Sequence, residues 1–161
     1  MFLRRISLLK DKITDSRQYP FSIPAIARLE SIELKSNITF FVGENGSGKS
    51  TLLEAIAYQC GFNIAGGGSN NSFELEAAKA ALSPTRQLSL LKVIYDLTKD
   101  NTSQFIIATH SPILLGYPEA QIINFNTSPI SEITYEETDH YQITKGFLNR
   151  RELYLKELFK E

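Results

Sequence analysis

The sequence predicts an α/β fold built around a largely parallel β-sheet. Residues 38–42 and 104–109 are rich in β-branched and aromatic side chains and show no apolar–polar alternation, which is typical of strands buried on both faces. A glycine-rich loop and a helical pattern follow the first stretch, and a Ser-Pro helix start follows the second. Buried strands that alternate with helices in this way indicate an α/β protein.

The part of the chain before the glycine-rich loop is expected to contain β-strands. Residues 2–9 are largely apolar and predict an opening strand, and residues 31–34 predict a second one. Residues 19–24 contain Pro20 and Pro24, which exclude a central strand there because proline has no backbone N–H to donate.

Helices are predicted after the first buried strand, from Pro84, and at the end of the chain. Residues 51–58 carry apolar side chains at helical spacing. Ser83 is the expected N-cap of a helix that starts at Pro84. This helix runs to residue 99 and has apolar residues three and four apart, namely Leu88, Leu91, Ile94 and Tyr95. Residues 122–125 and 130–135 predict later strands, and the tail from residue 144 predicts a helix.

Composition predicts one soluble domain over residues 1–161. The chain is 42% hydrophobic, and its 17 basic and 18 acidic residues give a net charge of −1. This balance gives no reason to expect binding to nucleic acid. No apolar run approaches the ~20 residues that span a bilayer, and Cys60, as the single cysteine, cannot form an internal disulfide. We therefore expect a cytoplasmic protein with no membrane segment.

The glycine-rich loop meets the pattern G-x-x-x-x-G-K-[ST] at Gly43, Gly48, Lys49 and Ser50, with a strand before it and a helix after it. Glycines permit backbone angles in which successive N–H groups turn inward around phosphates. The helix that follows offers its N-terminal donors and its positive dipole end to the same anion. The alternative is a chance glycine-rich turn, which the register of strand, loop and helix disfavours.

The loop therefore predicts a site for a purine nucleoside triphosphate, with ATP and Mg²⁺ as its ligands. We expect Lys49 to reach the β- and γ-phosphates, Ser50 to ligate Mg²⁺ and Thr51 to contact the α-phosphate. The expected binding residues are Gly43, Glu44, Asn45, Gly46, Ser47, Gly48, Lys49, Ser50 and Thr51.

Three blocks of the sequence resemble one family, in that family's order. Residues 40–56, FFVGENGSGKSTLLEAI, resemble the Walker A region of ABC-class ATPases that are often labelled AAA family ATPases, soluble relatives of transporter ATPases and SMC-type heads. Residues 80–84, AALSP, resemble the family's D-loop segment. Residues 105–114, FIIATHSPIL, resemble its switch-histidine strand.

The resemblance implies a three-layer P-loop NTPase fold with a mainly parallel central sheet and an N-terminal antiparallel β part. It also implies ATP hydrolysis coupled to a head-to-tail homodimer. His110 would be the switch histidine that contacts the γ-phosphate, and a loop histidine beside the helix start at Pro112 is the alternative. Tyr19 and Phe21 either lie where the family places an aromatic side chain against adenine, or pack under a proline loop.

The acids that complete such a site are not found in the sequence. By the resemblance, an aspartate that binds Mg²⁺ and a glutamate that activates water stand just before the AALSP block. Aligned without gaps, Glu76 takes the place of the aspartate as a Walker B candidate, and Ala77 that of the glutamate. The signature motif, the helical arm and the glutamine loop are missing as well. We interpret residues 66–79 as the place of a deletion or linker, or as a junction between stretches that flank an omitted segment.

Three functions are therefore open for this chain. The first is an ATP-binding ABC-class ATPase domain whose parent protein hydrolyses ATP, with hydrolysis weak or absent in this chain. The second is an interaction module that binds nucleotide as a switch without turning it over, and the third is a folded core with an empty site. Asp139 and His140 have no nucleophile nearby and predict a helix N-terminus with an exposed histidine, rather than acid–base chemistry.

Overall fold

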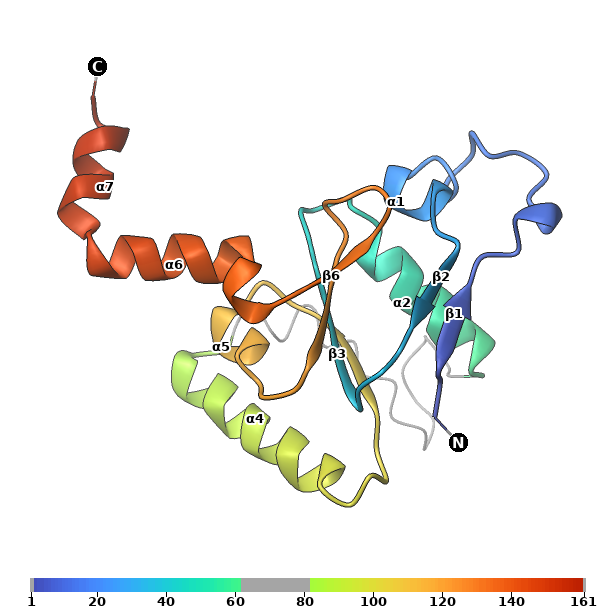
Figure 1. Ribbon diagram of the computed structural model, residues 1–161, viewed down its shortest axis with the longest axis horizontal. Helices are drawn as coiled ribbons and strands as arrows, with labels where there is room; N and C mark the ends of the chain where they lie inside the picture. The colour runs from blue at the N-terminus through green and yellow to red at the C-terminus, as the bar shows by residue number, and fades with distance from the viewer. Residues whose placement is uncertain (1, 62–81, 161) are drawn as a thin grey trace.

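The computed structural model describes residues 2–61 and 82–160, and a four-stranded sheet lies at the centre of these residues (Figure 1). Its strand order is β4–β3–β5–β6. The strands are β3 (Ile38–Val42), β4 (Phe105–Ala108), β5 (Gln121–Asn124) and β6 (Ser131–Ile133). β3 is parallel to β4 and β5, whereas β5 and β6 are antiparallel. A mixed sheet covered by helices agrees with the α/β class that the sequence predicts.

Strand β3 lies inside the sheet, and its position explains its sequence. All five of its residues are buried. Because side chains alternate between the faces of a strand, Phe40 and Val42 belong to one apolar core while Phe41 belongs to the other. Neither face meets water, so the sequence of this strand needs no polar alternation.

Helices cover the sheet on both faces. The first core joins Phe41 to α1 (Pro24–Ala27) and α2 (Lys49–Gln59), and the second joins Phe40 to α4 (Pro84–Thr98) and α5 (Pro112–Leu115). Figure 1 shows these two groups of helices on opposite sides of β3. The glycine-rich loop lies between β3 and α2, so it leaves the sheet at the edge where the parallel strands end.

The N-terminal segment adds a separate two-stranded sheet. β1 (Arg5–Ser7) and β2 (Ser31–Glu33) are antiparallel, with Ile6 opposite Ile32. A short 3-10 helix, η1 (Lys10–Lys12), follows β1. Ile32 is buried in the same core as Phe41, so this small sheet packs on the side of the central sheet that also carries α1 and α2.

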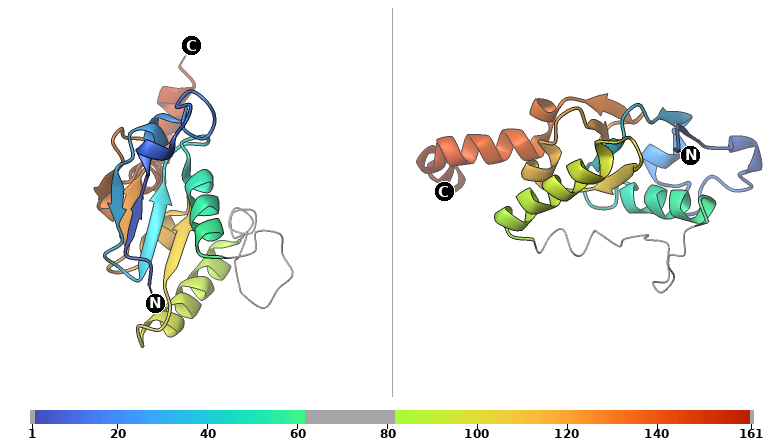
Figure 2. Two further views of the ribbon diagram at one scale, coloured as in Figure 1. Left: turned by 90° about the vertical axis from the view of Figure 1, so that its right-hand side faces the viewer. Right: turned by 90° about the horizontal axis from the view of Figure 1, so that it is seen from below.

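The C-terminal helices extend away from the sheet, as Figure 1 and the right-hand view of Figure 2 show. After the 3-10 helix η2 (Tyr135–Glu137), α6 (Asp139–Asn149) and α7 (Arg151–Leu158) are separated at Arg150, whose backbone leaves the helical region. The helical tail begins before residue 144 because the buried Thr138 caps α6 by accepting the Tyr141 N–H.

One expectation about burial is wrong. β4 is fully buried only at its C-terminal half, because it stands at the end of the strand order of the described sheet. The helix predicted from Pro84 is confirmed as α4. The stripe of α4 that faces the core runs through Leu91, Ile94 and Thr98, and Leu88 and Tyr95 are exposed.

Residues 66–79, with Glu76 and Ala77, lie outside the described residues. The helices within the described ranges include none with the length and apolar character to cross a membrane.

Candidate functional site

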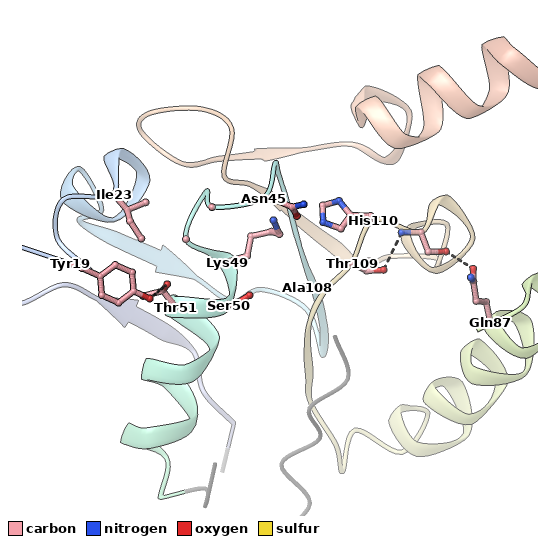
Figure 3. A pocket seen from close by; sticks show the side chains of 13 residues that line it. Tyr19, Ile23, Asn45, Lys49, Ser50, Thr51, Gln87, Ala108, Thr109 and His110 are labelled. Atoms are coloured by element: carbon pink, nitrogen blue, oxygen red, sulfur yellow. Dashed lines mark hydrogen bonds between the residues drawn. The ribbon is translucent and has the colours of Figure 1, made fainter. Parts of the chain in front are cut away.

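A cavity of about 760 Å³ opens at the carboxyl ends of β3 and β4 (Figure 3). Cavities of this size commonly hold small molecules and cofactors. It is lined from two sides: by the loop and first turn of α2, and by the end of β4 with the start of α4. The described residues that line it are Tyr19, Ile23, Asn45, Gly46, Gly48, Lys49, Ser50, Thr51, Gln87, Ala108, Thr109, His110 and Ser111.

Two glycines of the loop are required by both conformation and space. Gly43 has φ +144° and Gly48 has φ +101°, values that L side chains rarely adopt. A Cβ on Gly43 would lie 2.9 Å from Asn126 Oδ1, and one on Gly48 would lie 3.1 Å from Ile26 Cγ1. The loop is therefore packed tightly against its own scaffold at both ends.

Lys49 is the buried charge of the site. Only 6% of it is exposed, and its ammonium donates to the carbonyl oxygens of Gly43 (2.7 Å) and Glu44 (2.9 Å). A buried ammonium needs such partners to offset the loss of water. These bonds hold the positive charge beside the cavity, where an anion would meet it.

The start of α2 adds polar groups to the same wall. Gly48 is the N-cap and has no side chain to cap the helix. The first residues of α2 line the cavity, so the positive end of the helix lies beside it. Ser50 and Thr51 belong to the first turn. The Thr51 hydroxyl lies 2.8 Å from the Tyr19 hydroxyl, so an exposed aromatic ring is tied to the edge of the cavity.

Asn126 supports the loop from the neighbouring strand, and sequence reasoning missed it. Its Oδ1 accepts the Glu44 N–H at 2.6 Å, and its own N–H donates to Asn124 Oδ1 at 2.9 Å. It follows β5, which is parallel to β3. The carboxyl ends of parallel strands share one edge of a sheet. The position of Asn126 just after a predicted strand was therefore the signal that could have placed it near the loop.

His110 stands just after β4 on a backbone that is fixed on both sides. The buried Thr109 donates its N–H to the Phe41 carbonyl (3.2 Å) and accepts the Ser111 N–H (3.1 Å). The Ser111 hydroxyl donates to Gln87 Oε1 at 2.5 Å, which connects this turn to α4. Gln87 is a second lining residue that sequence reasoning missed.

The ring of His110 meets the ring of His140, from the first turn of α6. His110 Nδ1 and His140 Nε2 are 2.8 Å apart, and the ring centroids are 5.0 Å apart. Asp139 begins α6, so the expected helix N-terminus is confirmed. The prediction that His140 is exposed is wrong, because this side chain is half-buried against His110.

The surroundings of His140 favour its neutral form. Burial lowers its pKa most, and repulsion from His110 and Lys49 lowers it further, while Asp139 and Glu44 act in the opposite direction. Glu44 and Lys49 belong to the glycine-rich loop, so the histidine pair lies within the electrostatic reach of the cavity.

The structure brings most of the predicted site residues to one cavity. Asn45, Gly46, Gly48, Lys49, Ser50, Thr51 and His110 line it, while Gly43, Glu44 and Ser47 shape the loop behind them. Tyr19 lines the cavity, whereas Phe21 packs against the first core. Of the described lining residues, none is Asp or Glu. Glu76, the Walker B candidate, lies outside the described ranges.

Within residues 2–61 and 82–160 there is also no group of three His, Cys, Asp or Glu side chains that would hold a metal by itself. Any cation bound in the cavity by these residues would therefore share its ligands with a bound anion or with water.

Comparison with known proteins assigns the family. A family model described as "AAA domain" matches residues 12–160, a range that includes the glycine-rich loop, β4 and both histidines. No significant match was found among curated proteins or among solved structures. The matched range covers nearly the whole chain, and the chain therefore belongs to the AAA domain family of P-loop ATPases.

Proposed function

We propose that this chain is an ABC-class ATPase domain that binds ATP together with Mg²⁺ in the cavity between α2 and β4. The observation that carries the proposal is Lys49, a buried ammonium held at the end of a glycine loop in which Gly43 and Gly48 leave little room for a Cβ. A triphosphate is the common small molecule whose charge and length suit such a cradle beside a helix N-terminus.

Each lining group has a defined role in this proposal. Lys49 binds the β- and γ-phosphates, the α2 N–H groups and Thr51 bind the inner phosphates, and His110 binds the γ-phosphate from the opposite wall. The exposed Tyr19 ring, tied to Thr51, offers the adenine a stacking surface. Figure 3 shows Tyr19 and His110 on opposite sides of Lys49, as these roles require.

The donor set also fits Mg²⁺. The Ser50 hydroxyl is a hard oxygen ligand in the first turn of α2, and Mg²⁺ usually takes few protein ligands and completes its shell with phosphate oxygens and water. Bound Mg²⁺ neutralises phosphate charge. The chain's own contribution is to orient the phosphates through Lys49 and the loop N–H groups.

Hydrolysis in this chain is proposed to be weak or absent, although the parent protein would hydrolyse ATP. Activation of water needs a general base, and among the described lining residues there is no carboxylate. The same observation favours the second candidate function, an interaction module that changes its binding with nucleotide and does not turn it over.

Isothermal titration of the full chain with ATP and Mg²⁺ tests the proposal. Lys49→Ala should weaken binding about 100-fold, because each hydrogen bond to a charged group contributes about 1.5–3 kcal/mol. The matched control is Lys92→Ala, which removes an exposed lysine of α4 that pairs with Asp96 and should leave the affinity unchanged. Equal affinities of the wild-type chain and Lys49→Ala would refute the site.

A phosphate-release assay on the same samples separates the two candidate functions. Release at background, with ATP binding intact, supports the interaction module. Release above background that is lost in Lys49→Ala supports the ATPase and places a general base in this chain. If the wild-type chain binds no ATP, both candidates fail.

We further propose that residues 1–161 form one cytoplasmic domain of the three-layer, mainly parallel ABC type, and that ATP promotes a head-to-tail homodimer with two nucleotides at its interface. In such a dimer the second copy would cover the cavity lined by Lys49 and His110. Molar mass measured by light scattering with and without ATP and Mg²⁺ tests this, and a monomer at saturating ATP would contradict it.

A further inference from the structure

The pairing of His110 with His140 joins two segments that are 30 residues apart. His110 follows β4 on the cavity wall, and His140 is the second residue of α6. The 3-10 helix η2, which directly precedes α6, is held on α5, because the Tyr135 hydroxyl donates to the Pro112 carbonyl at 2.9 Å. The backbone on which each ring stands is therefore held by hydrogen bonds of its own, through Thr109 beside His110 and through Tyr135 ahead of His140.

The chemistry of imidazole links the protonation of the two rings. At 2.8 Å between His110 Nδ1 and His140 Nε2, one nitrogen donates and the other accepts. If His140 donates, neutral His110 accepts at Nδ1 and carries its own proton on Nε2. If His140 accepts, His110 donates from Nδ1 and its Nε2 is a bare acceptor. The tautomer of one ring fixes that of the other.

Only one of these arrangements suits an anion in the cavity. A terminal phosphate has only acceptor oxygens, so a neutral His110 can bond to it only when Nε2 carries a proton. The half-buried His140, whose neutral form is favoured by its surroundings, can supply the N–H that reserves Nδ1 of His110 as the acceptor.

We propose that His140 is a positioning residue that holds the ring and the tautomer of His110, so that His110 Nε2–H donates to the terminal phosphate of a bound triphosphate. The inference rests on the proposed function of the cavity. It assigns to α6 a part in distinguishing a nucleoside triphosphate from a diphosphate, since only the triphosphate presents the phosphate that His110 contacts. A contact that only stabilises the fold would alter unfolding and leave this discrimination unchanged.

The first test needs no nucleotide. The ¹⁵N shifts of the histidine rings, measured on the full chain labelled at histidine, report the tautomer of each ring. We expect His110 to carry its proton on Nε2 in the wild-type chain and to become a mixture of tautomers in His140→Phe. A wild-type His110 protonated on Nδ1 alone would overturn the inference whether or not the chain binds ATP.

The second test compares ATP and ADP affinities by calorimetry. His140→Phe keeps an aromatic ring and removes the nitrogen, and it should weaken ATP binding about fivefold, as expected for one hydrogen bond, with ADP binding unchanged. His140→Gln retains an N–H donor and should restore most of the ATP affinity. Ile143→Ala, an exposed position on the same helix, is the matched control and should change neither affinity.

The outcomes separate this inference from the function on which it rests. If the wild-type chain binds ATP in a manner that needs Lys49, but His140→Phe has the wild-type ratio of ATP to ADP affinity, the role of His140 is wrong and the binding site stands. Equal losses of ATP and ADP affinity in both His140→Phe and His140→Gln would also overturn it, because that pattern indicates a structural contact.

Discussion

Gly48 is the position where the structure makes the sharpest prediction about stability. Its φ of +101° places it in a region that costs a residue with a Cβ about 1–2 kcal/mol. In addition, a Cβ there would lie 3.1 Å from Ile26 Cγ1 and 3.2 Å from Ile23 Cγ2. Ile26 is only 4% exposed, so it cannot move aside without disturbing a packed core.

The chain contains a matched control for the second of these costs. Gly46 is in the same loop with φ +83°, and a Cβ on it would meet no atom within 4 Å. Gly46→Ala should therefore cost only the conformational term. Gly48→Ala should cost about 1–3 kcal/mol more, the usual range for overpacking a core. The reduced entropy of the unfolded chain offsets both substitutions equally and cancels in the difference.

Urea unfolding of the nucleotide-free protein measures this difference. We expect both variants to keep the wild-type slope and Gly48→Ala to have the lower midpoint. After the unfolded-chain offset of about 0.4–1 kcal/mol is subtracted, Gly48→Ala should lose a total of about 1–4 kcal/mol. This is a substantial part of the ~5–15 kcal/mol of a typical domain. Equal midpoints for the two variants would refute the packing argument and leave only the backbone angle.

Two further substitutions test the support of the loop and of the sheet. Asn126→Ala removes the acceptor of the Glu44 N–H and should cost about 1 kcal/mol in urea unfolding and weaken ATP binding in calorimetry; unchanged affinity would show that this bond does not hold the loop. Glu132 accepts a hydrogen bond from the Lys35 ammonium, the main reason that its pKa is lowered. The contribution of this pair is therefore present above the ordinary glutamate pKa and is lost as pH falls through the folded value. Glu132→Gln should remove this small part of the acid dependence, since exposed ion pairs contribute little. An unaltered pH profile of unfolding would contradict the assignment.

The features that could be predicted from the sequence are those written in contiguous residues. β3 and the glycine loop form one continuous stretch whose residue types predict a buried strand and a phosphate-binding turn. The capping side chains of Ser83 and Ser111 accept N–H groups only three residues ahead. Such local patterns depend on neighbouring residues and not on contacts between distant parts of the chain. Their functional interpretation rested on the same stretch, and this is why it pointed to one cavity.

The residues that sequence reasoning missed act across long distances in the chain. Asn126 bonds to a loop residue 82 positions away, and Gln87 meets Ser111 across 24 positions. Neither belongs to a local motif, and only the register of the parallel strands brings Asn126 to the loop. The sequence also leaves open which face of α4 is buried. Several apolar residues lie at helical spacing on more than one side of this helix, and only the packing decides which stripe faces the core.

An ATPase must bind a triphosphate and must also activate water, and the described lining residues of the cavity supply groups only for the first of these. Holding a triphosphate requires donors and positive charge, which Lys49, the first turn of α2 and His110 supply from two walls of one cavity. Cleaving it requires a base for water, and the described lining residues include no carboxylate. Because these groups come from different segments of a chain, loss of the second does not remove the first. Nucleotide affinity and turnover are therefore expected to respond to different residues. The histidine pair is expected to act on affinity, since the acceptor proposed for it is a phosphate oxygen and not the attacking water.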